Sequence, residues 1–130
     1  MTSFTEEKVK KQRTILVVED QRHSLILLKK MLEYLDFEVL TAENGQEAVD
    51  ICNNVNDFSM ILMDLKMPVM DGFAAMRAIK KLHPGLTIIA ETAYALSGDE
   101  SKILAAGFDD YLSKPITRET LSAVIERNLH

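Results

Sequence analysis

The sequence predicts an α/β fold, a doubly wound parallel sheet of five strands alternating with five helices. Apolar runs of strand length alternate along the chain with longer segments whose hydrophobic residues recur at helical spacing. This alternation is typical of βαβ units, and three of the runs are nearly all apolar, as strands covered on both faces should be. With 130 residues and 47% hydrophobic content, the chain can form one domain with a substantial core.

The individual elements follow from these runs and from local end signals. Strands are predicted at residues 14–18 (TILVV), 38–42 (EVLTA), 59–64 (SMILMD), 86–91 (LTIIAE) and 110–113 (DYLS). Helices are predicted near residues 22–35, 44–55, 72–83, 98–106 and 117–129. Pro84–Gly85 should stop the third helix, and Gly107 follows the fourth. Thr117 can cap the fifth helix, with Thr120 in its first turn.

Composition excludes several classes of protein. The chain has 15 Lys+Arg and 20 Asp+Glu, and no basic stripe beyond a short N-terminal run, so we expect no direct nucleic-acid partner. Cys52 is the only cysteine, and no apolar run reaches membrane-spanning length, so we expect a reduced, cytoplasmic setting without membrane insertion. Residues 1–13 lack the apolar stretch of a secretory signal. We expect them to form a flexible leader before a single domain at 14–130.

Polar residues follow four of the predicted strands. Glu19 and Asp20 end the first strand, and Asp64 ends the third. Thr92 follows the fourth strand, and Lys114 follows the fifth. A single acid at a strand end is usually a solvated loop residue, but ligand sites of doubly wound sheets lie beyond the carboxyl ends of the strands. The five residues should therefore converge on one rim and form the candidate site.

Four separated segments carry a resemblance to a known family. VVED, MDLKMPVMDG, ETA and YLSKP occur in a fixed order and resemble the signature segments of the response-regulator receiver domain of two-component signal transduction, over about residues 14–129. The resemblance implies a flavodoxin-like (βα)5 fold with strand order 2-1-3-4-5. It implies a regulatory phosphoacceptor rather than an enzyme. Asp64 would accept a phosphoryl group from a histidine kinase or a histidine phosphotransfer protein.

A divalent cation would make the acidic rim stable. Two carboxylates about 4 Å apart repel by roughly 4 kcal/mol near a protein surface. Mg²⁺, or Mn²⁺ in its place, would remove this cost, since Mg²⁺ prefers oxygen ligands and is usually held by one or two carboxylates plus phosphate oxygens. In the receiver pattern, Asp20 and Asp64 would bind the metal directly, Glu19 through water, and Lys66 through its main-chain carbonyl.

The resemblance also implies how the phosphoryl group is held and sensed. Lys114 and the metal would spread the charge of the group in flight, so that the Asp64 carboxylate attacks without a separate base. The hydroxyl of Thr92 and the main-chain N–H of Ala93 would then reach the phosphoryl oxygens. Tyr111 would move into the space vacated by this loop, which makes Thr92 and Tyr111 the switch residues.

Four further residues have structural or unusual places in this pattern. Lys114–Pro115 would be a cis peptide bond, and Gly72 would let the loop after Asp64 enter the third helix. Glu91 stands where receivers usually carry an apolar residue, so its carboxylate must be paired or reached by solvent. Its partner could be Lys80, Lys81 or Lys102, or it could mark an unusual output face. Tyr94 would slow water attack on the phosphorylated form.

Three other functions share parts of the pattern. An aspartyl-phosphate phosphatase would need a second acid where this chain has Lys66. A flavodoxin would need a Ser/Thr/Gly-rich phosphate loop in place of EDQRHS after the first strand. A receiver-like interaction module that never meets phosphate stays open, and acetyl phosphate would separate it from a phosphoacceptor.

We expect the domain to pass on its signal by contact with another protein. The chain ends close to the predicted fifth helix, so we expect no DNA-binding or enzymatic output domain. The resemblance fits a free-standing regulator, a phosphorelay intermediate or part of a hybrid kinase. The downstream target is unknown, and phosphorylation could drive formation of a homodimer.

Overall fold

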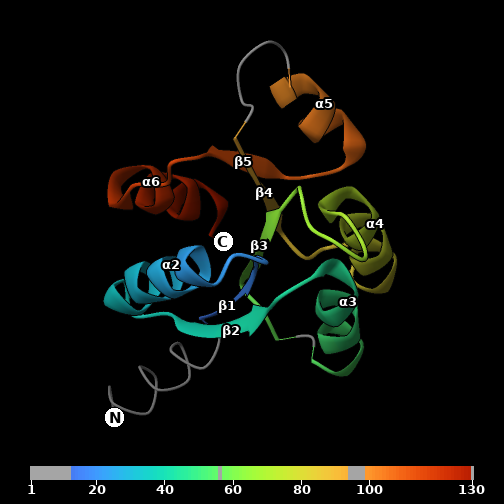
Figure 1. Ribbon diagram of the computed structural model, residues 1–130, viewed down its shortest axis with the longest axis horizontal. Coiled ribbons are helices and arrows are strands. Elements are labelled where there is room, and N and C mark those ends of the chain that lie inside the picture. Colours follow the sequence, from blue (N-terminus) through green and yellow to red (C-terminus); the bar gives the residue numbers. More distant parts are fainter. Residues whose placement is uncertain (1–12, 56, 94–98, 130) are drawn as a thin grey trace.

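A five-stranded parallel sheet forms the centre of the molecule, in the order β2-β1-β3-β4-β5 (Figure 1). The computed structural model describes residues 13–55, 57–93 and 99–129. Its strands are β1 (Thr14–Val18), β2 (Glu38–Ala42), β3 (Met60–Asp64), β4 (Ile88–Thr92) and β5 (Asp110–Ser113). This architecture confirms the predicted fold class and strand order.

Helices cover both faces of this sheet (Figure 1). One face carries α2 (Arg22–Tyr34) and α6 (Arg118–Asn128), and the other carries α3 (Gly45–Asn54), α4 (Gly72–Leu82) and α5 (Asp99–Ala106). Successive strand residues point to opposite faces. On β1, Ile15 and Val17 pack towards α2 and α6, while Leu16 and Val18 pack on the other side. The inner strands are apolar throughout because both of their faces are buried.

Strand boundaries agree with the prediction except in the third and fourth strands. The third strand begins at Met60, one residue later than predicted. The fourth was predicted at 86–91 but runs from Ile88 to Thr92. Its limits are set by its neighbours, because pairing with β3 starts at Ile88 and pairing with β5 continues to Thr92. Apolar content alone could not locate these partners, and Thr92 is the last residue of the strand.

Helix ends carry the expected chemistry. Thr117 accepts a hydrogen bond from the Thr120 backbone and forms a reciprocal capping box with it, which confirms the predicted cap. Gly107 follows α5 with φ of 124°, a conformation that favours glycine. The third helix ends at Leu82, just before Pro84–Gly85. The predicted leader, apart from Arg13, and the predicted first residue of the fourth helix lie outside the described residues. Within the described ranges, no helix is both long and apolar enough to cross a membrane.

Candidate functional site

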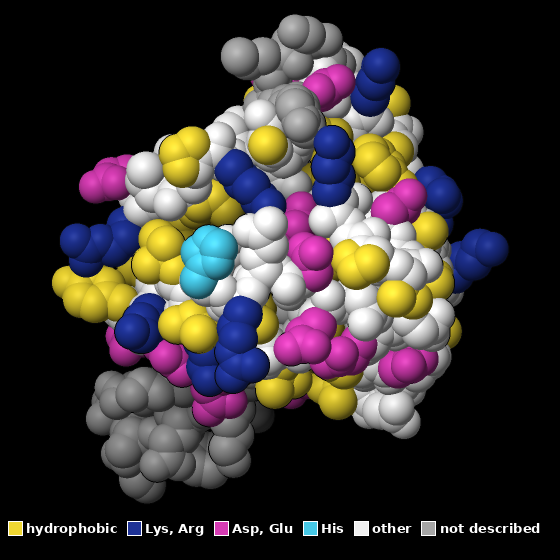
Figure 2. Space-filling model, viewed as in Figure 1, with side chains coloured by type: hydrophobic (Ala, Val, Ile, Leu, Met, Phe, Trp, Pro, Cys, Tyr) yellow, Lys and Arg dark blue, Asp and Glu magenta, His cyan; other side chains and the backbone are white. Residues whose placement is uncertain are grey.

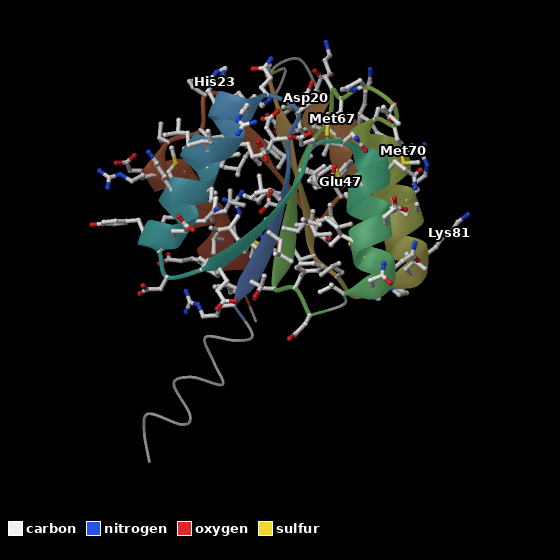
Figure 3. All side chains as sticks on the ribbon, turned by 60° about the horizontal axis from the view of Figure 1, so that its bottom comes forward. Asp20, His23, Glu47, Met67, Met70 and Lys81 are labelled. Atoms are coloured by element: carbon white, nitrogen blue, oxygen red, sulfur yellow. The ribbon has the colours of Figure 1, made fainter. Side chains whose placement is uncertain are left out.

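The carboxyl ends of four strands bring the candidate residues to one rim. A cavity of about 880 Å³ opens at this rim, and its lining includes Asp20, Asp64, Lys66, Thr92, Ala93 and Lys114. Figure 2 views the molecule from this side and shows acidic side chains at its centre with cationic side chains beside them. In Figure 3, Asp20 and Met67, from the segments after β1 and β3, lie at the same end of the sheet. The topology therefore produces the convergence that the strand-end residues predicted.

Three carboxylates form a compact cluster at this rim. Glu19, Asp20 and Asp64 each offer an oxygen, and these oxygens lie within 4.8 Å of one another. Glu19 and Asp64 are buried, at 1% and 5% exposure, whereas Asp20 is exposed. One side of the cluster is therefore open to water while two acids face each other in the protein. This donor set fits a hard divalent cation such as Mg²⁺, which prefers carboxylate oxygen and retains several waters.

Glu19 shows the electrostatic cost of this crowding. The pKa of its carboxyl is raised from 4.5 to about 7, by burial first and by the neighbouring Asp64 second, while Lys114 and the Gln21 backbone N–H oppose the rise. Its Oε1 has no hydrogen-bond partner among the described residues. A carboxyl with this pKa is partly protonated near neutral pH, which lowers its repulsion of Asp64. A cation would take over this role by displacing the proton.

Lys114 contacts two acids of the cluster. Its Nζ lies 3.3 Å from Asp64 Oδ1 and 3.5 Å from Glu19 Oε1. Burial alone would lower the pKa of Lys114, but attraction by Asp64, Glu19 and Glu91 raises it above its ordinary value. The backbone N–H of Lys114 donates to the Thr92 carbonyl at 2.8 Å, and the following Lys114–Pro115 bond is cis. The hydrogen bond holds the Lys114 backbone next to β4, and attraction by the neighbouring acids favours the charged form of its ammonium.

The loop from Asp64 to Gly72 packs tightly under the site. A Cβ on Gly72 would lie 2.4 Å from the Asp64 carbonyl oxygen and 2.9 Å from Leu65 Cα, so only glycine fits. Gly45, which sequence analysis did not select, has a similar role, because its Cβ would lie 2.5 Å from the Met70 carbonyl oxygen. The backbone N–H of Lys66 approaches Asp64 Oδ1 at 3.3 Å. The loop therefore brings the main chain of Lys66 next to the Asp64 carboxylate.

The predicted switch residues lie on adjacent strands. Thr92 is 5% exposed and pairs with Ser113 across β4 and β5, while Tyr111 pairs with Ala90. Because side chains two residues apart point to the same face of a sheet, Thr92 and Tyr111 share the face covered by α5. Ala93 lines the cavity beside Thr92. Tyr94, predicted to flank the site, lies outside the described residues.

Glu91 lies closer to the site than sequence analysis placed it. It is fully buried on β4, opposite Asp64 on one side and Leu112 on the other, and neither carboxylate oxygen has a hydrogen-bond partner among the described residues. None of the three lysines considered as partners pairs with it there, and Lys80 instead contacts Asp109 at 2.7 Å. The pKa of Glu91 is raised from 4.5 to about 8, mainly by burial, while repulsion from Glu19 and Asp64 adds to the rise and Lys114 opposes it.

Asp110 anchors the strand that carries the lysine. Its carboxylate accepts hydrogen bonds from Arg127 Nε at 2.7 Å and Asn128 Nδ2 at 2.7 Å, both on α6. Burial would raise the pKa of Asp110, but these hydrogen bonds hold it below its ordinary value. Sequence analysis missed this positioning role. Two adjacent acids at the start of a strand give no sign that the second will contact the C-terminal end of the helix that follows.

Comparisons with known proteins identify the family. The family model described as the response regulator receiver domain matches residues 15–126. The chain is 39% identical over 116 residues to the signal transduction histidine-protein kinase BarA of Escherichia coli (strain K12). It is 44% identical over 119 residues to hybrid signal transduction histidine kinase G of Dictyostelium discoideum. These alignments cover 88% and 87% of this chain but only 12% and 3% of the two kinases.

Solved structures show the same fold. The receiver domain of sensor histidine kinase PA1611 from Pseudomonas aeruginosa PAO1, with magnesium coordinated in its active site cleft, matches with a TM-score of 0.81 and 37% identity over 88% of this chain and 95% of that one. The response regulator TrrA from Thermotoga maritima, in complex with Mg²⁺ and BeF, matches with a TM-score of 0.80 and 30% identity over 90% and 99% of the two chains. With its sheet order, its acidic rim and these matches, the chain belongs to the response regulator receiver domain family.

Proposed function

We propose that Asp64 is the phosphoacceptor of this receiver domain, in a reaction that depends on Mg²⁺, and that the donor is a histidine kinase or a histidine phosphotransfer protein. The observation that carries this assignment is the position of Asp64 in the cluster. Asp64 offers one of three carboxylate oxygens that lie within 4.8 Å of one another, and its Oδ1 is the nearer of the two acidic contacts of Lys114, at 3.3 Å. A carboxylate nucleophile needs no base at neutral pH.

The chemistry is an exchange of one bond to phosphorus for another. An Asp64 oxygen forms a bond to phosphorus while the bond from phosphorus to the donor's imidazole nitrogen breaks, leaving its electron pair on the imidazole. Lys114 lies where it can neutralise the phosphoryl oxygens. Asp20 and Asp64 would hold Mg²⁺ directly, with Glu19 acting through water and Lys66 through its carbonyl. The bound cation would supply positive charge to the transferring oxygens. Mn²⁺ offers the same charge and oxygen preference.

The response to phosphorylation would pass through Thr92 and Tyr111. The Thr92 hydroxyl and the Ala93 N–H lie at the same cavity as Asp64, where they can donate to phosphoryl oxygens. Movement of that segment would change the space available to Tyr111 on the neighbouring strand. The output would be a changed surface for a protein target, or for a second copy of the chain.

The cellular context follows from the same chemistry. We propose a receiver domain at residues 14–130 behind a leader at 1–13, working in the cytoplasm without direct nucleic-acid contact. The formal charge of -5 disfavours a phosphate backbone as partner. Cys52 is a buried free thiol, as is usual in reducing compartments.

Intact-mass measurement tests the assignment of Asp64. Incubation with acetyl phosphate and Mg²⁺ should add one phosphoryl group to the wild type and none to Asp64→Asn. Asp71→Asn is the matched control, because Asp71 lines the same cavity and caps α4, where asparagine caps equally well. Uptake by this control should persist. A wild type that gains no mass, or an Asp64→Asn protein that gains it, would contradict the proposal and favour the interaction module.

A further inference from the structure

A second cavity, of about 220 Å³, lies between α2 and the segment that follows β5. It is on the face of the sheet that carries α2 and α6 (Figure 1). Its walls are mostly apolar, and its lining includes Leu27, Met31 and Ile116 together with Glu19, Glu91 and Lys114. Leu27 is 53% exposed, so the cavity is open to solvent along α2.

The side chain of Glu91 points to this side of the sheet. Successive residues of β4 alternate between the two faces. Ile88 and Ala90 pack in the core under α3, α4 and α5, whereas Ile89 packs in the core under α2 and α6. Glu91 comes two residues after Ile89 and therefore shares its face. Although Glu91 also borders the rim cavity, its carboxylate lies at the floor of the second cavity.

The carboxylates at this floor have too few donors. Both oxygens of Glu91 and Oε1 of Glu19 are buried without a hydrogen-bond partner among the described residues. Lys114 Nζ lies 3.3 Å from Asp64 Oδ1 and 3.5 Å from Glu19 Oε1, and no ion pair between described residues includes Glu91. Buried acceptors without donors are costly. A cationic donor that enters the cavity would remove this cost.

The shape and chemistry of the cavity select a particular kind of cation. Its volume is below the ~300 to 1,000 Å³ of pockets for drug-sized ligands, so only a small molecule fits. The apolar walls do not suit Mg²⁺, which keeps several waters. A primary ammonium carries three N–H donors, as lysine does, and no acceptor. A short carbon chain attached to it would lie against the apolar side chains of α2.

We propose that the second cavity binds a small primary alkylammonium ion, whose N–H groups donate to Glu91 and Glu19 and whose carbon chain packs against Leu27 and Met31. The binding is non-covalent. The inference does not depend on the role of Asp64 as phosphoacceptor, because Asp64 lines the rim cavity and not this one.

Titration with butylammonium chloride, followed by NMR of the methionine methyl groups, tests the site. The buffer contains no divalent metal and is at pH 9, above the raised pKa of Glu91 of about 8, where an alkylammonium keeps its charge as lysine does. The Met31 methyl signal should shift and saturate. Met76, in the core on the other face of the sheet, should not shift. Affinity should rise roughly two- to fourfold for each methylene added between ethylammonium and butylammonium, since each is buried against the walls.

Variants test the role of the floor carboxylate. Glu91→Gln keeps the size of the side chain and should weaken binding roughly tenfold or more, as expected for loss of hydrogen bonds to a charged group. Glu33→Gln is the matched control, because Glu33 is an exposed acid of α2 outside the cavity lining, and it should bind as the wild type does. If Glu91→Gln does not fold, Glu91→Leu, whose side chain suits a buried strand, takes its place with the same expected loss.

Two further measurements locate the ligand. Tetramethylammonium has no N–H donor and should not displace butylammonium. Asp20→Asn changes an acid of the rim cavity and should weaken binding much less than Glu91→Gln does. Absence of a saturable Met31 shift, equal affinity in the wild type and the Glu91 variant, or an equal loss in Asp20→Asn would overturn the proposal. Phosphoryl uptake from acetyl phosphate is measured separately, so failure of this proposal leaves the assignment of Asp64 intact.

Discussion

Glu91 is the residue whose placement has the clearest energetic consequence. A buried polar group without hydrogen bonds costs about 1 to 3 kcal/mol. Both oxygens of Glu91 lack partners among the described residues, and the nearest charges are two acids and Lys114. Replacement by leucine, the kind of residue that fits a strand buried on both faces, removes this cost. We therefore expect Glu91→Leu to raise the free energy of unfolding at pH 8 by about 1 to 3 kcal/mol.

The pH dependence gives this prediction its sign. The pKa of Glu91 is raised from 4.5 to about 8, so between these values the folded state holds a proton that the unfolded state has released. Stability then falls as pH rises through this window. Glu19, raised to about 7, acts in the same direction. Urea unfolding in chelator at pH 5.5 and pH 8 should show the wild type less stable at the higher pH, and Glu91→Leu with a smaller difference. A wild type that is more stable at pH 8 than at pH 5.5 would refute the prediction.

At the residue scale, sequence revealed chemistry but not partners. The strand-end pattern selected Glu19, Asp20, Asp64, Thr92 and Lys114, because topology brings strand ends together whatever the strand order. The environment of Glu91 required the register that sets it opposite Asp64 and Leu112. Three lysines were considered for it, and none pairs with it among the described residues. The lysines were candidates because of their charge alone. The sequence does not show which strands are neighbours, and therefore which side chains surround Glu91.

At the scale of elements, the approach of α4 to β3 depends on one glycine. Alanine at Gly72 would bring its Cβ to 2.4 Å from a backbone oxygen of Asp64, which cannot move aside as a flexible side chain can. We expect Gly72→Ala to lower the free energy of unfolding by about 2 kcal/mol or more and to slow phosphoryl uptake by displacing Asp64. Denaturant unfolding and the rate of mass gain with acetyl phosphate measure the two effects.

Gly85 provides the matched control for this prediction. It lies in the turn that follows α4, and a Cβ there would meet nothing within 4 Å. Gly85→Ala should change stability by less than about 0.5 kcal/mol, as is usual for surface substitutions. If Gly72→Ala behaved like Gly85→Ala, the close approach of the loop to Asp64 would not be a constraint.

The ends of helices and strands were predictable where they depend on residues close together in the sequence. Thr117 capped α6 as expected, because a cap is a contact between residues three apart. The fourth strand was predicted two residues too early at its start and one too early at its end, because its limits depend on pairing with β3 and β5. The tight fit of Gly45 against Met70 was likewise not predictable, since it brings the start of α3 against a loop 25 residues further along the sequence.

For the whole molecule, the parallel sheet is what turns separated motifs into a site. Alternating apolar runs predicted its class, whereas the strand order 2-1-3-4-5 came from family resemblance and not from any pattern in the runs. Once that order is set, β1 and β3 are neighbours and their terminal acids must meet. Burial and then the neighbouring Asp64 raise the pKa of Glu19, and this crowding of acids is the reason to expect a cation at the rim.

The dependence of global stability on Mg²⁺ tests this central claim most directly. A cation that binds only the folded state adds about 1.4 kcal/mol to the free energy of unfolding for each tenfold increase in concentration above its dissociation constant. Urea unfolding across a Mg²⁺ series should show this rise in the wild type and a much smaller one in Asp20→Asn, whose side chain is exposed and should not perturb the core. The same rise in both proteins, or no rise in the wild type, would contradict the account.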